Sequence, residues 1–283
     1  TLNMATLYLV GTPIGNLGDI TFRAIETLKN ADFIACEDTR VTKKLCNHYD
    51  IQTPLKSYHE HNKSQQTEYL IDLLNEGYNI ALVSDAGLPL ISDPGYELVV
   101  AAHSYDIHVE TVPGPNAGLT ALMASGLPSY TYTFLGFLPR KEKDKVAVLQ
   151  ERMFQDSTLI IYESPFRVVE TLKAISKVDD TRRVAVGREL TKKFEQIMMQ
   201  EVEHLINAFQ NDEIMQKGEF VILIEGAKPL ETEQWFQSLT ISEHVEHYIS
   251  EQNIKPKKAI KLVAEDRHMK TGEVYDIYHD VNQ

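Results

Sequence analysis

The sequence predicts an α/β protein built from two α/β domains with a small helical appendage at the C-terminal end. Short β-rich runs alternate with amphipathic helical stretches through the first half of the 283-residue chain, and such alternation is typical of a buried parallel sheet. The length exceeds what one compact core usually holds, which favours more than one domain. Beyond Gly226 the strand signals fade and helical periodicity continues, which indicates the appendage.

The first predicted domain, residues 4–125, alternates strand and helix in a regular order. Runs rich in β-branched and aromatic residues predict its strands, and apolar residues at helical spacing predict its helices. The strands are expected at 6–10, 33–36, 80–84 and 108–112, and the helices at 22–30, 39–49, 64–76 and 94–102. The last of these helices has the clearest start, with Asp93 as the N-cap and Pro94 at the first helical position.

The second predicted domain, residues 126–228, begins where the character of the chain changes. An aromatic-rich segment at 130–137 precedes a charged helix at 141–154, and a further helix is expected at 166–177. Strands at 158–162, 183–187, 196–199 and 220–224 predict a sheet with mixed pairing. The appendage, residues 229–283, is expected to hold helices near 231–239, 243–251, 257–266 and 272–279.

Composition excludes several classes of protein. The hydrophobic fraction of 43% and the charged fraction of 24% are ordinary for a soluble protein. No apolar run approaches the length of a membrane span, so we expect no membrane role. No N-terminal stretch has the pattern of a secretory signal, so the expected location is the cytoplasm. Cys36 and Cys46 match neither a redox pair nor a zinc site in their spacing.

The charge balance argues mildly against a nucleic-acid partner. The formal net charge is −13, and phosphate contacts need local Lys and Arg. Net charge does not describe patches, however, and basic residues cluster at 140–145, 182–193 and 255–261. Each cluster can also be a solvated face balanced by neighbouring acids.

Three turns of the first domain carry the candidate ligand site. Residues 10–19 form a glycine-rich loop whose glycines fit neither the dinucleotide fingerprint nor the Walker pattern. Residues 84–95 combine acids with prolines and glycines. An Asp at the end of a strand can accept hydrogen bonds from an ammonium group or a ribose, and small residues let backbone amides approach a ligand. Residues 112–119 form the third turn, with Asn116 as the expected N-cap.

Each turn alone can be read as a tight or capped connection. Three such turns after strands of one parallel sheet converge at its carboxyl edge, where α/β proteins bind their ligands. The residues therefore predict a cofactor cleft, although by themselves they do not name the ligand.

The order of the motifs resembles that of the tetrapyrrole methylases. The resemblance runs from about residue 6 to residue 226 and rests on GTPIGNLGD at 11–19, SDAGLPLISDPG at 84–95, PGPNA at 113–117, YESPFR at 162–167, RELTKK at 188–193 and GEFV at 218–221. The first loop departs from the denser glycine pattern of the corrin and haem-pathway members. ACEDTR at 35–40 and SYHEHN at 57–62 instead resemble the RNA-modifying branch of the family.

This resemblance implies a bilobal enzyme that folds S-adenosyl-L-methionine into the cleft between its two α/β domains, usually as a homodimer. It implies 2′-O-methylation of a cytidine ribose in 16S ribosomal RNA, with the assembled small ribosomal subunit as the expected partner. Carried over by position, the cofactor contacts of the first domain are Pro13, Asp85, Leu88, Ile91, Ser92, Asn116 and Ala117. Those of the second domain are Glu163, Leu190 and Gly218.

Methylation of a ribose hydroxyl needs a base or a strong hydrogen-bond acceptor for its proton. The catalytic candidates are Asp38, Glu37 and Lys193. We favour Asp38 because it follows a strand beside Arg40, which could hold phosphate and orient the carboxylate. The alternative is a surface ion pair between these two residues. Substrate contacts are expected from Arg40, His59, His61, Asn62, Arg140, Lys141, Arg167, Arg188 and Lys192.

Other interpretations remain open at this point. His59 and His61 could be metal ligands on one face of a strand, but nothing nearby completes a coordination set, so we expect no metal. The chain could methylate a small tetrapyrrole or a diphthamide precursor, or it could be a ligand-binding interaction module without catalysis. The basic appendage could be a helix-turn-helix-like RNA-binding element, or a dimer or lid helix.

Overall fold

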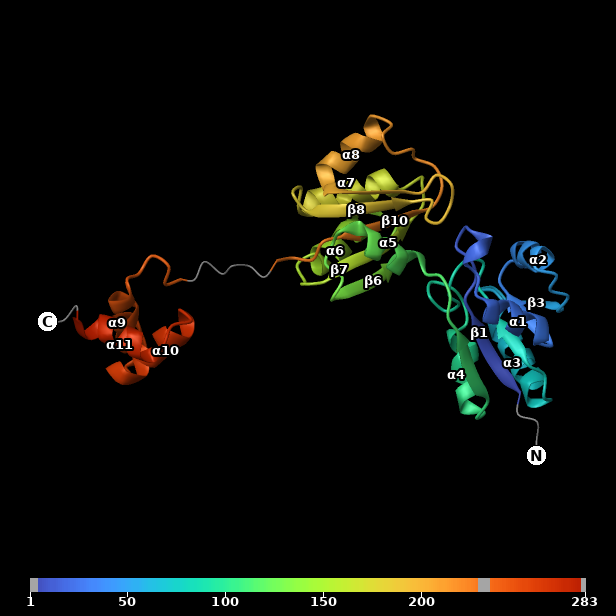
Figure 1. Ribbon diagram of the computed structural model, residues 1–283, viewed down its shortest axis with the longest axis horizontal. Helices are drawn as coiled ribbons and strands as arrows, with labels where there is room; N and C mark the ends of the chain where they lie inside the picture. Colours follow the sequence, from blue (N-terminus) through green and yellow to red (C-terminus); the bar gives the residue numbers. More distant parts are fainter. Residues whose placement is uncertain (1–4, 229–234, 281–283) are drawn as a thin grey trace. The chain divides into compact units, whose positions relative to one another are not determined.

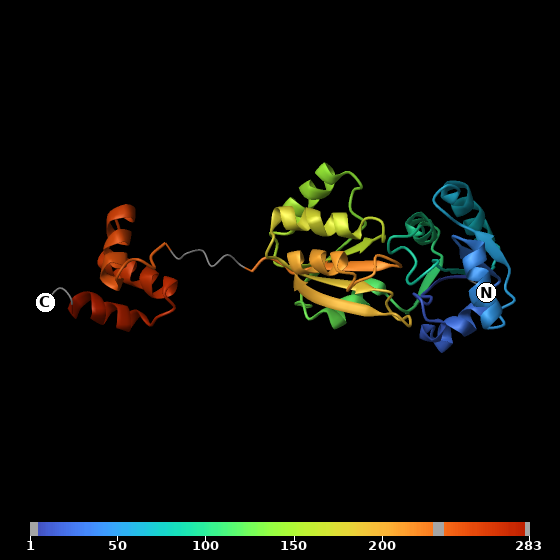
Figure 2. The ribbon, with the colours of Figure 1, turned by 90° about the horizontal axis from the view of Figure 1, so that it is seen from above.

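The computed structural model describes residues 5–228 and 235–280. The chain divides into two compact units, Thr1–Gly226 and Ala227–Gln283. The first unit contains two separate five-stranded sheets, coloured blue to green and green to orange in Figures 1 and 2. The two α/β folds and the C-terminal helices confirm the predicted fold class.

The first sheet is parallel throughout, as the alternating pattern predicted. Its strands are β1 (Thr6–Val10), β2 (Phe33–Cys36), β3 (Leu55–Ser57), β4 (Ile80–Leu82) and β5 (His108–Val112), in the order β3-β2-β4-β1-β5. The strands that precede the three unusual turns, β4, β1 and β5, are therefore direct neighbours. Strand β3 was not predicted.

Helices cover both faces of this sheet. Helices α1 (Phe22–Asn30) and α2 (Thr39–His48) pack on one face against Ile34 and Cys36 of β2. Helices α3 (Lys63–Asn75) and α4 (Tyr96–Ser104) pack on the other face, against Ala35 of the same strand and Leu7 and Leu82 of its neighbours. Successive side chains of a strand point to opposite faces, so the apolar strands bury both sides.

The start of α4 corrects one prediction. Asp93 and Pro94 do not begin the helix; α4 starts at Tyr96 with Gly95 as its N-cap, and no side chain caps it. Gly95 has φ +142°, a conformation that residues with a Cβ rarely adopt. The helix therefore begins after the glycine, and the Asp93 carboxyl is left for contacts with Glu37.

The second sheet has mixed pairing, as predicted. Its strands are β6 (Tyr132–Gly136), β7 (Thr158–Glu163), β8 (Arg183–Arg188), β9 (Gln196–Glu201) and β10 (Phe220–Ile224), in the order β6-β7-β10-β8-β9. Only the pair β6 and β7 is parallel among these described strands. Strand β6 lies in the aromatic-rich segment that the sequence left unassigned.

Two helical layers enclose the second sheet. Helices α6 (Glu142–Arg152), α7 (Val168–Val178) and α8 (Val202–Gln210) cover one face, and α5 (Ala117–Ser125) covers the other. Helix α5 follows β5 of the first sheet directly but contacts β7, β8, β9 and β10 of the second. It joins the two lobes just before residue 126, where the domain boundary remains a prediction.

The second unit is a small helical bundle. Helices α9 (Ile241–Gln252), α10 (Pro256–Asp266) and α11 (Thr271–Asp280) share one apolar core. Thr240 and Glu243 form a capping box at the start of α9, and Pro256 begins α10. Of the helix expected near 231–239, residues 231–234 lie outside the described residues, and 235–238 form a turn. No helix within the described ranges is long and apolar enough to cross a membrane.

Candidate active site

The three turns at the carboxyl edge of the first sheet are bonded into one surface. Thr12 and Gly87 exchange backbone hydrogen bonds of 2.9 and 3.1 Å, which joins the turn after β1 to the turn after β4. Gly11 and Gly114 bring the turns after β1 and β5 into backbone contact. A Cβ on Gly11 would lie 2.6 Å from Gly114 Cα, so these two positions require glycine.

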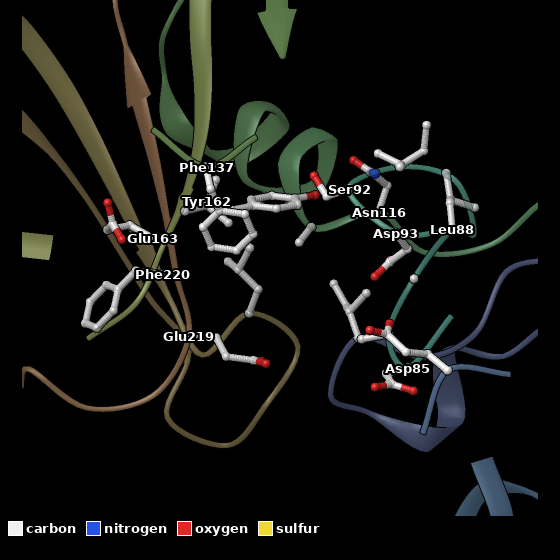
Figure 3. A pocket seen from close by; sticks show the side chains of 18 residues that line it. Asp85, Leu88, Ser92, Asp93, Asn116, Phe137, Tyr162, Glu163, Glu219 and Phe220 are labelled. Atoms are coloured by element: carbon white, nitrogen blue, oxygen red, sulfur yellow. The ribbon is translucent and has the colours of Figure 1, made fainter. Parts of the chain in front are cut away.

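Beside these turns lies a cavity of about 300 Å³ that is walled by both lobes. Figure 3 shows Asp85, Leu88, Ser92, Asp93 and Asn116 on one side and Glu163, Glu219 and Phe220 on the other. Its volume is at the lower end of the range for small-molecule sites. The described residues that line it are Ile14, Glu37, Asp85, Ala86, Gly87, Leu88, Ile91, Ser92, Asp93, Asn116, Ala117, Phe137, Tyr162, Glu163, Leu190, Glu219, Phe220 and Val221.

Most of the expected cofactor contacts meet in this lining. The expected contacts that line the cavity are Asp85, Leu88, Ile91, Ser92, Asn116, Ala117, Glu163 and Leu190. Glu37, one of the catalytic candidates, lines it as well. Pro13 and Gly218 lie outside the lining, each next to a lining residue, Ile14 and Glu219. Sequence reasoning missed Asp93, Phe137, Tyr162 and Glu219 as cavity residues. The dense motif at 84–95 was the available signal for Asp93.

Two loops around the cavity carry strained backbone. Leu90 and Ser92 after β4 have φ of 71° and 65°, and Glu189 and Thr191 after β8 have φ of 51° and 70°. Such left-handed conformations are unfavourable for residues with a Cβ and cluster where a loop is shaped for a ligand. The strain therefore coincides with the cavity on both of its sides.

Three acidic side chains meet on the first lobe's side of the cavity. Burial, together with the negative charges of Glu37 and Asp85, raises the pKa of Asp93 to about 7. Burial and the charge of Asp85 also raise the pKa of Glu37. The carboxyl groups of Glu37 and Asp93 are hydrogen-bonded to each other, so one of them holds a proton. Asp85 accepts a 3.0 Å hydrogen bond from the backbone N–H of Asp38.

Aromatic rings form the wall contributed by the second lobe. The Tyr162 hydroxyl accepts a 3.1 Å hydrogen bond from the backbone N–H of Gly118 in the first turn of α5. Its ring contacts Phe134 and Phe137 edge to face, with centroids 5.0 and 6.1 Å apart. Tyr162 thus fixes the start of α5 against β7, next to Asn116, whose side chain caps α5 through a 2.8 Å bond from Leu119 N–H. The expected N-cap role of Asn116 is confirmed.

Glu163 has a structural role at the edge of the cavity. Its buried carboxylate accepts hydrogen bonds from Ser164 N–H at 2.9 Å, Arg167 Nε at 3.2 Å and Thr171 Oγ1 at 2.8 Å. These partners satisfy its oxygens and neutralise its charge. Arg167, an expected phosphate contact, is held in this ion pair.

The charge of the lining is one-sided. Five carboxylates face or border the cavity, from Glu37, Asp85, Asp93, Glu163 and Glu219, and none of the described lining residues is Lys, Arg or His. Within the described part of the chain, only Glu163 and Glu219 have cationic partners at hydrogen-bond distance, Arg167 and Lys192. The cavity therefore suits a ligand with positive charge.

Asp38, the favoured base, lies outside the cavity lining. Its carboxylate caps α2 through Arg40 N–H at 3.0 Å and binds the Arg40 guanidinium at 3.1 and 3.0 Å. Hydrogen bonds from the Arg40 side chain and backbone lower the pKa of Asp38. The Arg40 side chain is 88% exposed. The structure thus contains the surface ion pair that was the alternative interpretation.

The histidine motif forms a turn before α3. Asn62 Oδ1 accepts a 2.8 Å bond from His59 N–H, and Asn62 Nδ2 donates to Ser57 O at 3.2 Å. The rings of His59 and His61 are 5.9 Å apart. Within residues 5–228 and 235–280 no group of three or more His, Cys, Asp or Glu could hold a metal ion.

The basic candidates of the second lobe differ in how they are paired. Lys192 forms ion pairs with Glu189 at 3.1 Å and Glu219 at 3.2 Å, whereas Arg188 donates to the backbone oxygens of Lys217 and Phe194. Lys193 lies with its Nζ 5.5 Å from the Phe194 ring. Arg140 and Lys141 are exposed at the start of α6.

Two α/β lobes around an acidic cavity at a parallel sheet's carboxyl edge define a class of small-ligand-binding α/β proteins. The chain belongs to the tetrapyrrole methylase family: residues 6–206 match the family described as Tetrapyrrole (Corrin/Porphyrin) Methylases. The resemblance drawn from the motifs is thereby confirmed.

Two relatives of high identity share one name. The chain is 52% identical over 276 residues to a Halalkalibacterium halodurans protein named "Ribosomal RNA small subunit methyltransferase I", covering 97% of this chain and 94% of the relative. It is 50% identical over 280 residues to a Bacillus subtilis protein of the same name, covering 98% and 95%.

Solved structures agree in fold at low identity. A diphthine synthase superposes with a TM-score of 0.60 at 13% identity, covering 78% of this chain and 90% of the other. A uroporphyrin-III-C-methyltransferase from Thermus thermophilus superposes with a TM-score of 0.55 at 19% identity, covering 79% and 95%. At these identities the likeness shows the fold alone.

Proposed function

We propose that the protein transfers a methyl group from S-adenosyl-L-methionine to the ribose 2′-hydroxyl of a cytidine in 16S ribosomal RNA. The observation that carries the proposal is the cavity whose lining holds five carboxylates and, among the described residues, no basic side chain. It is joined by the relatives at 52% and 50% identity that are named small-subunit ribosomal RNA methyltransferases.

The residues present fit S-adenosylmethionine. The group carries a positive sulfonium and an ammonium, which the Asp85 carboxylate and the hydrogen-bonded pair of Glu37 and Asp93 complement in charge. Its apolar and aromatic parts match Leu88 and Tyr162. When bound, the cofactor would supply an electrophilic methyl group on a positively charged sulfur, and this sulfur leaves with the electron pair of the carbon–sulfur bond when an aligned oxygen attacks the methyl carbon.

Glu37 is the base that the geometry supports best. It lines the cavity and its pKa is raised, and a carboxylate with a raised pKa accepts a proton more readily at neutral pH. Asp38 is engaged with Arg40 and has a lowered pKa. Glu37 would accept the proton of the 2′-hydroxyl, and Asp93 would hold the Glu37 carboxyl in place through their shared hydrogen bond.

The remaining cellular context follows from the same proposal. The RNA is bound within the assembled small ribosomal subunit, where basic proteins offset the chain's net charge of −13. The protein acts in the cytoplasm as a homodimer. Arg40, Arg140 and Lys141 are exposed and available to phosphates.

The rival functions are a methyltransferase for a tetrapyrrole or diphthamide precursor and a ligand-binding module without catalysis. The similarity to a diphthine synthase rests on 13% identity and favours the first rival only through the fold. The exposed Lys193, on the loop that follows β8, and the half-buried Arg188, at the end of β8, favour a polyanionic substrate.

The test combines calorimetric measurement of cofactor binding with an assay of methyl transfer. Titration with S-adenosylmethionine should show binding at one site per chain, and tritium should pass from the cofactor to small ribosomal subunits. Mapping of ribose methylation in 16S ribosomal RNA from a strain without this protein should show the loss of one modified cytidine. Binding without transfer to subunits would refute the proposal in favour of the non-catalytic module.

A further inference from the structure

Two phenylalanines present exposed rings beside the cavity. Phe166 is 84% exposed and Phe194 is 67% exposed. Phe166 lies between β7 and α7, and Phe194 lies between β8 and β9. Single exposed apolar residues are common on protein surfaces, so their meaning depends on where the two loops lie and on what surrounds them.

Both loops lie at the same end of the strands of the second sheet. Phe220 at the start of β10 pairs with Glu163 at the end of β7 and with Arg188 at the end of β8. Glu163, Leu190 and Glu219, next to these strand ends, line the cavity, and Figure 3 shows Glu163, Phe220 and Glu219 together on that side. The two exposed rings are thus on loops that continue the cavity wall.

Hydrogen bonds from side chains to backbone oxygens connect these loops. Gln216 Nε2 donates to Pro165 O at 2.7 Å, which joins the loop of Phe166 to the segment before β10. Arg188 Nε donates to Lys217 O at 2.7 Å and its Nη1 to Phe194 O at 3.4 Å, which joins the loop of Phe194 to the same segment. The two rings therefore lie on loops that hydrogen bonds connect through the segment before β10.

Unpaired positive charges accompany the rings. Lys193 and Lys217 are exposed, and neither forms an ion pair with any residue in the described part of the chain. Lys193 Nζ lies 5.5 Å from the Phe194 ring centroid. By contrast, Lys192 and Arg167 are neutralised by carboxylates. We call Phe166, Phe194, Lys193 and Lys217 the aromatic rim.

We propose that the aromatic rim binds single-stranded RNA, with unpaired bases stacked on Phe166 and Phe194 and phosphates bound by Lys193 and Lys217. Exposed aromatic rings interleaved with cations are the surface that proteins use for unpaired nucleotides. A duplex hides its base faces, so the rim selects a strand with accessible bases. This inference rests on the proposed function, because it supplies the approach of the RNA strand to the cavity.

The test uses the full-length protein with a fluorescently labelled, unstructured RNA oligonucleotide and the same oligonucleotide annealed to its complement. Phe166→Ala and Phe194→Ala should each weaken binding of the single strand by roughly tenfold, the scale of one lost base stack. Phe194→Trp should retain affinity, and Phe194→Leu should not. Lys193→Gln and Lys217→Gln should each reduce the salt dependence of binding by about 0.7 in log–log slope.

Phe154→Ala is the matched control. Phe154 is 64% exposed and precedes β7, at the opposite end of that strand from Glu163. It should bind RNA as the parent does, and all variants should keep their affinity for S-adenosylmethionine.

Equal losses of RNA affinity in Phe154→Ala and the rim variants would overturn the proposal that the aromatic rim binds single-stranded RNA. Equal affinity for the duplex and the single strand would overturn it as well. So would a change in molecular mass of the rim variants by light scattering, because the rim would then contact a second copy of the chain. A parent protein that binds the oligonucleotide but transfers no methyl group to small subunits would instead refute the proposed function.

Discussion

Glu37 and Asp38 are adjacent in the chain yet lie in different electrostatic environments. Burial of the Glu37 side chain in the cavity, together with the negative charge of Asp85, raises its pKa. The Asp38 carboxylate turns to the first turn of α2 and to Arg40, which lowers its pKa. The motif at 35–40 predicted a functional carboxylate at this strand end, but only the three-dimensional packing distinguishes the two positions.

Glu37→Gln should therefore reduce the rate of methyl transfer by roughly 10²- to 10⁴-fold, the usual contribution of a general base. Asp38→Ala should retain most of its transfer activity and lose some thermal stability, because α2 loses its N-cap. Single-turnover transfer to small subunits measures the first effect and thermal unfolding the second. The opposite pattern, with Asp38→Ala inactive and Glu37→Gln active, would make Asp38 the base.

The protonation of Asp93 should make cofactor binding depend on pH. The pKa of Asp93 is about 7, so its carboxyl is mainly neutral below that pH and mainly negative above it. A cationic ligand binds the negative form better, so the affinity for S-adenosylmethionine should rise between about pH 6 and pH 8. Asp93→Asn should flatten this dependence in calorimetric titrations. An unchanged dependence in Asp93→Asn would assign it to another group.

The free protein should respond to pH in the opposite sense. The folded-state pKa of Asp93 is raised from 3.8 to about 7. Its contribution to stability is therefore fully present below about pH 4 and is lost as the pH rises through about 7. Relative to the parent, Asp93→Asn should gain melting temperature above pH 7. Differential scanning calorimetry without ligand at pH 6 and pH 8 measures this difference, and an equal shift at both values would contradict it.

At the scale of elements, the sequence correctly predicted the strands whose first and last residues are determined by the local residue pattern. The bounds of β1, β2, β5 and β10 agree with expectation, because their apolar and β-branched runs are bounded by turn residues. Strand β3 has three residues, all half-buried, which is too short for a periodic signal. Helix α8 was not predicted either, because it follows β9 directly and has no side-chain cap to mark its start.

The candidate site was predictable to the extent that it lies on strand ends. Asp85 and Asn116 could be assigned from the turns that follow β4 and β5. Tyr162 and Phe137 could not, because they reach the cavity through the packing of the second lobe on α5. Asp93 was misassigned because a helix-cap pattern, Asp followed by Pro, precedes a glycine that starts the helix later.

Gly11→Ala tests whether the contact between the turns after β1 and β5 shapes the cavity. The added Cβ would lie 2.6 Å from backbone of Gly114, and backbone yields less readily than a side chain. We expect a loss of about 1–3 kcal/mol in the free energy of unfolding and weaker cofactor binding. Gly272→Ala in α11, where a Cβ meets nothing within 4 Å, is the control and should be neutral or slightly stabilising. Equal unfolding midpoints in urea for the two variants would contradict the expectation.

At the scale of the whole molecule, the cavity and the helical bundle belong to different compact units. The bundle's lysines Lys255, Lys257, Lys258 and Lys261 are all exposed at the start of α10, and none forms an ion pair within the described residues. The apolar side of α10 is used by Ala259, Ile260 and Val263 in the bundle core. The free face of this helix end is therefore cationic, which suits phosphate contacts.

A protein that ends at Gly226 should consequently bind S-adenosylmethionine with the affinity of the full chain, because the whole cavity lining precedes that residue. Its affinity for small ribosomal subunits should fall, and the full-length Lys257→Gln/Lys258→Gln/Lys261→Gln variant should show the same fall with a reduced salt dependence, since fewer phosphates are neutralised. Lys173→Gln, at an exposed position of α7, controls for the loss of a surface charge. If the truncated protein binds subunits as tightly as the full chain but elutes at a smaller assembly size, the bundle serves in dimerisation and the RNA is held by the first unit alone.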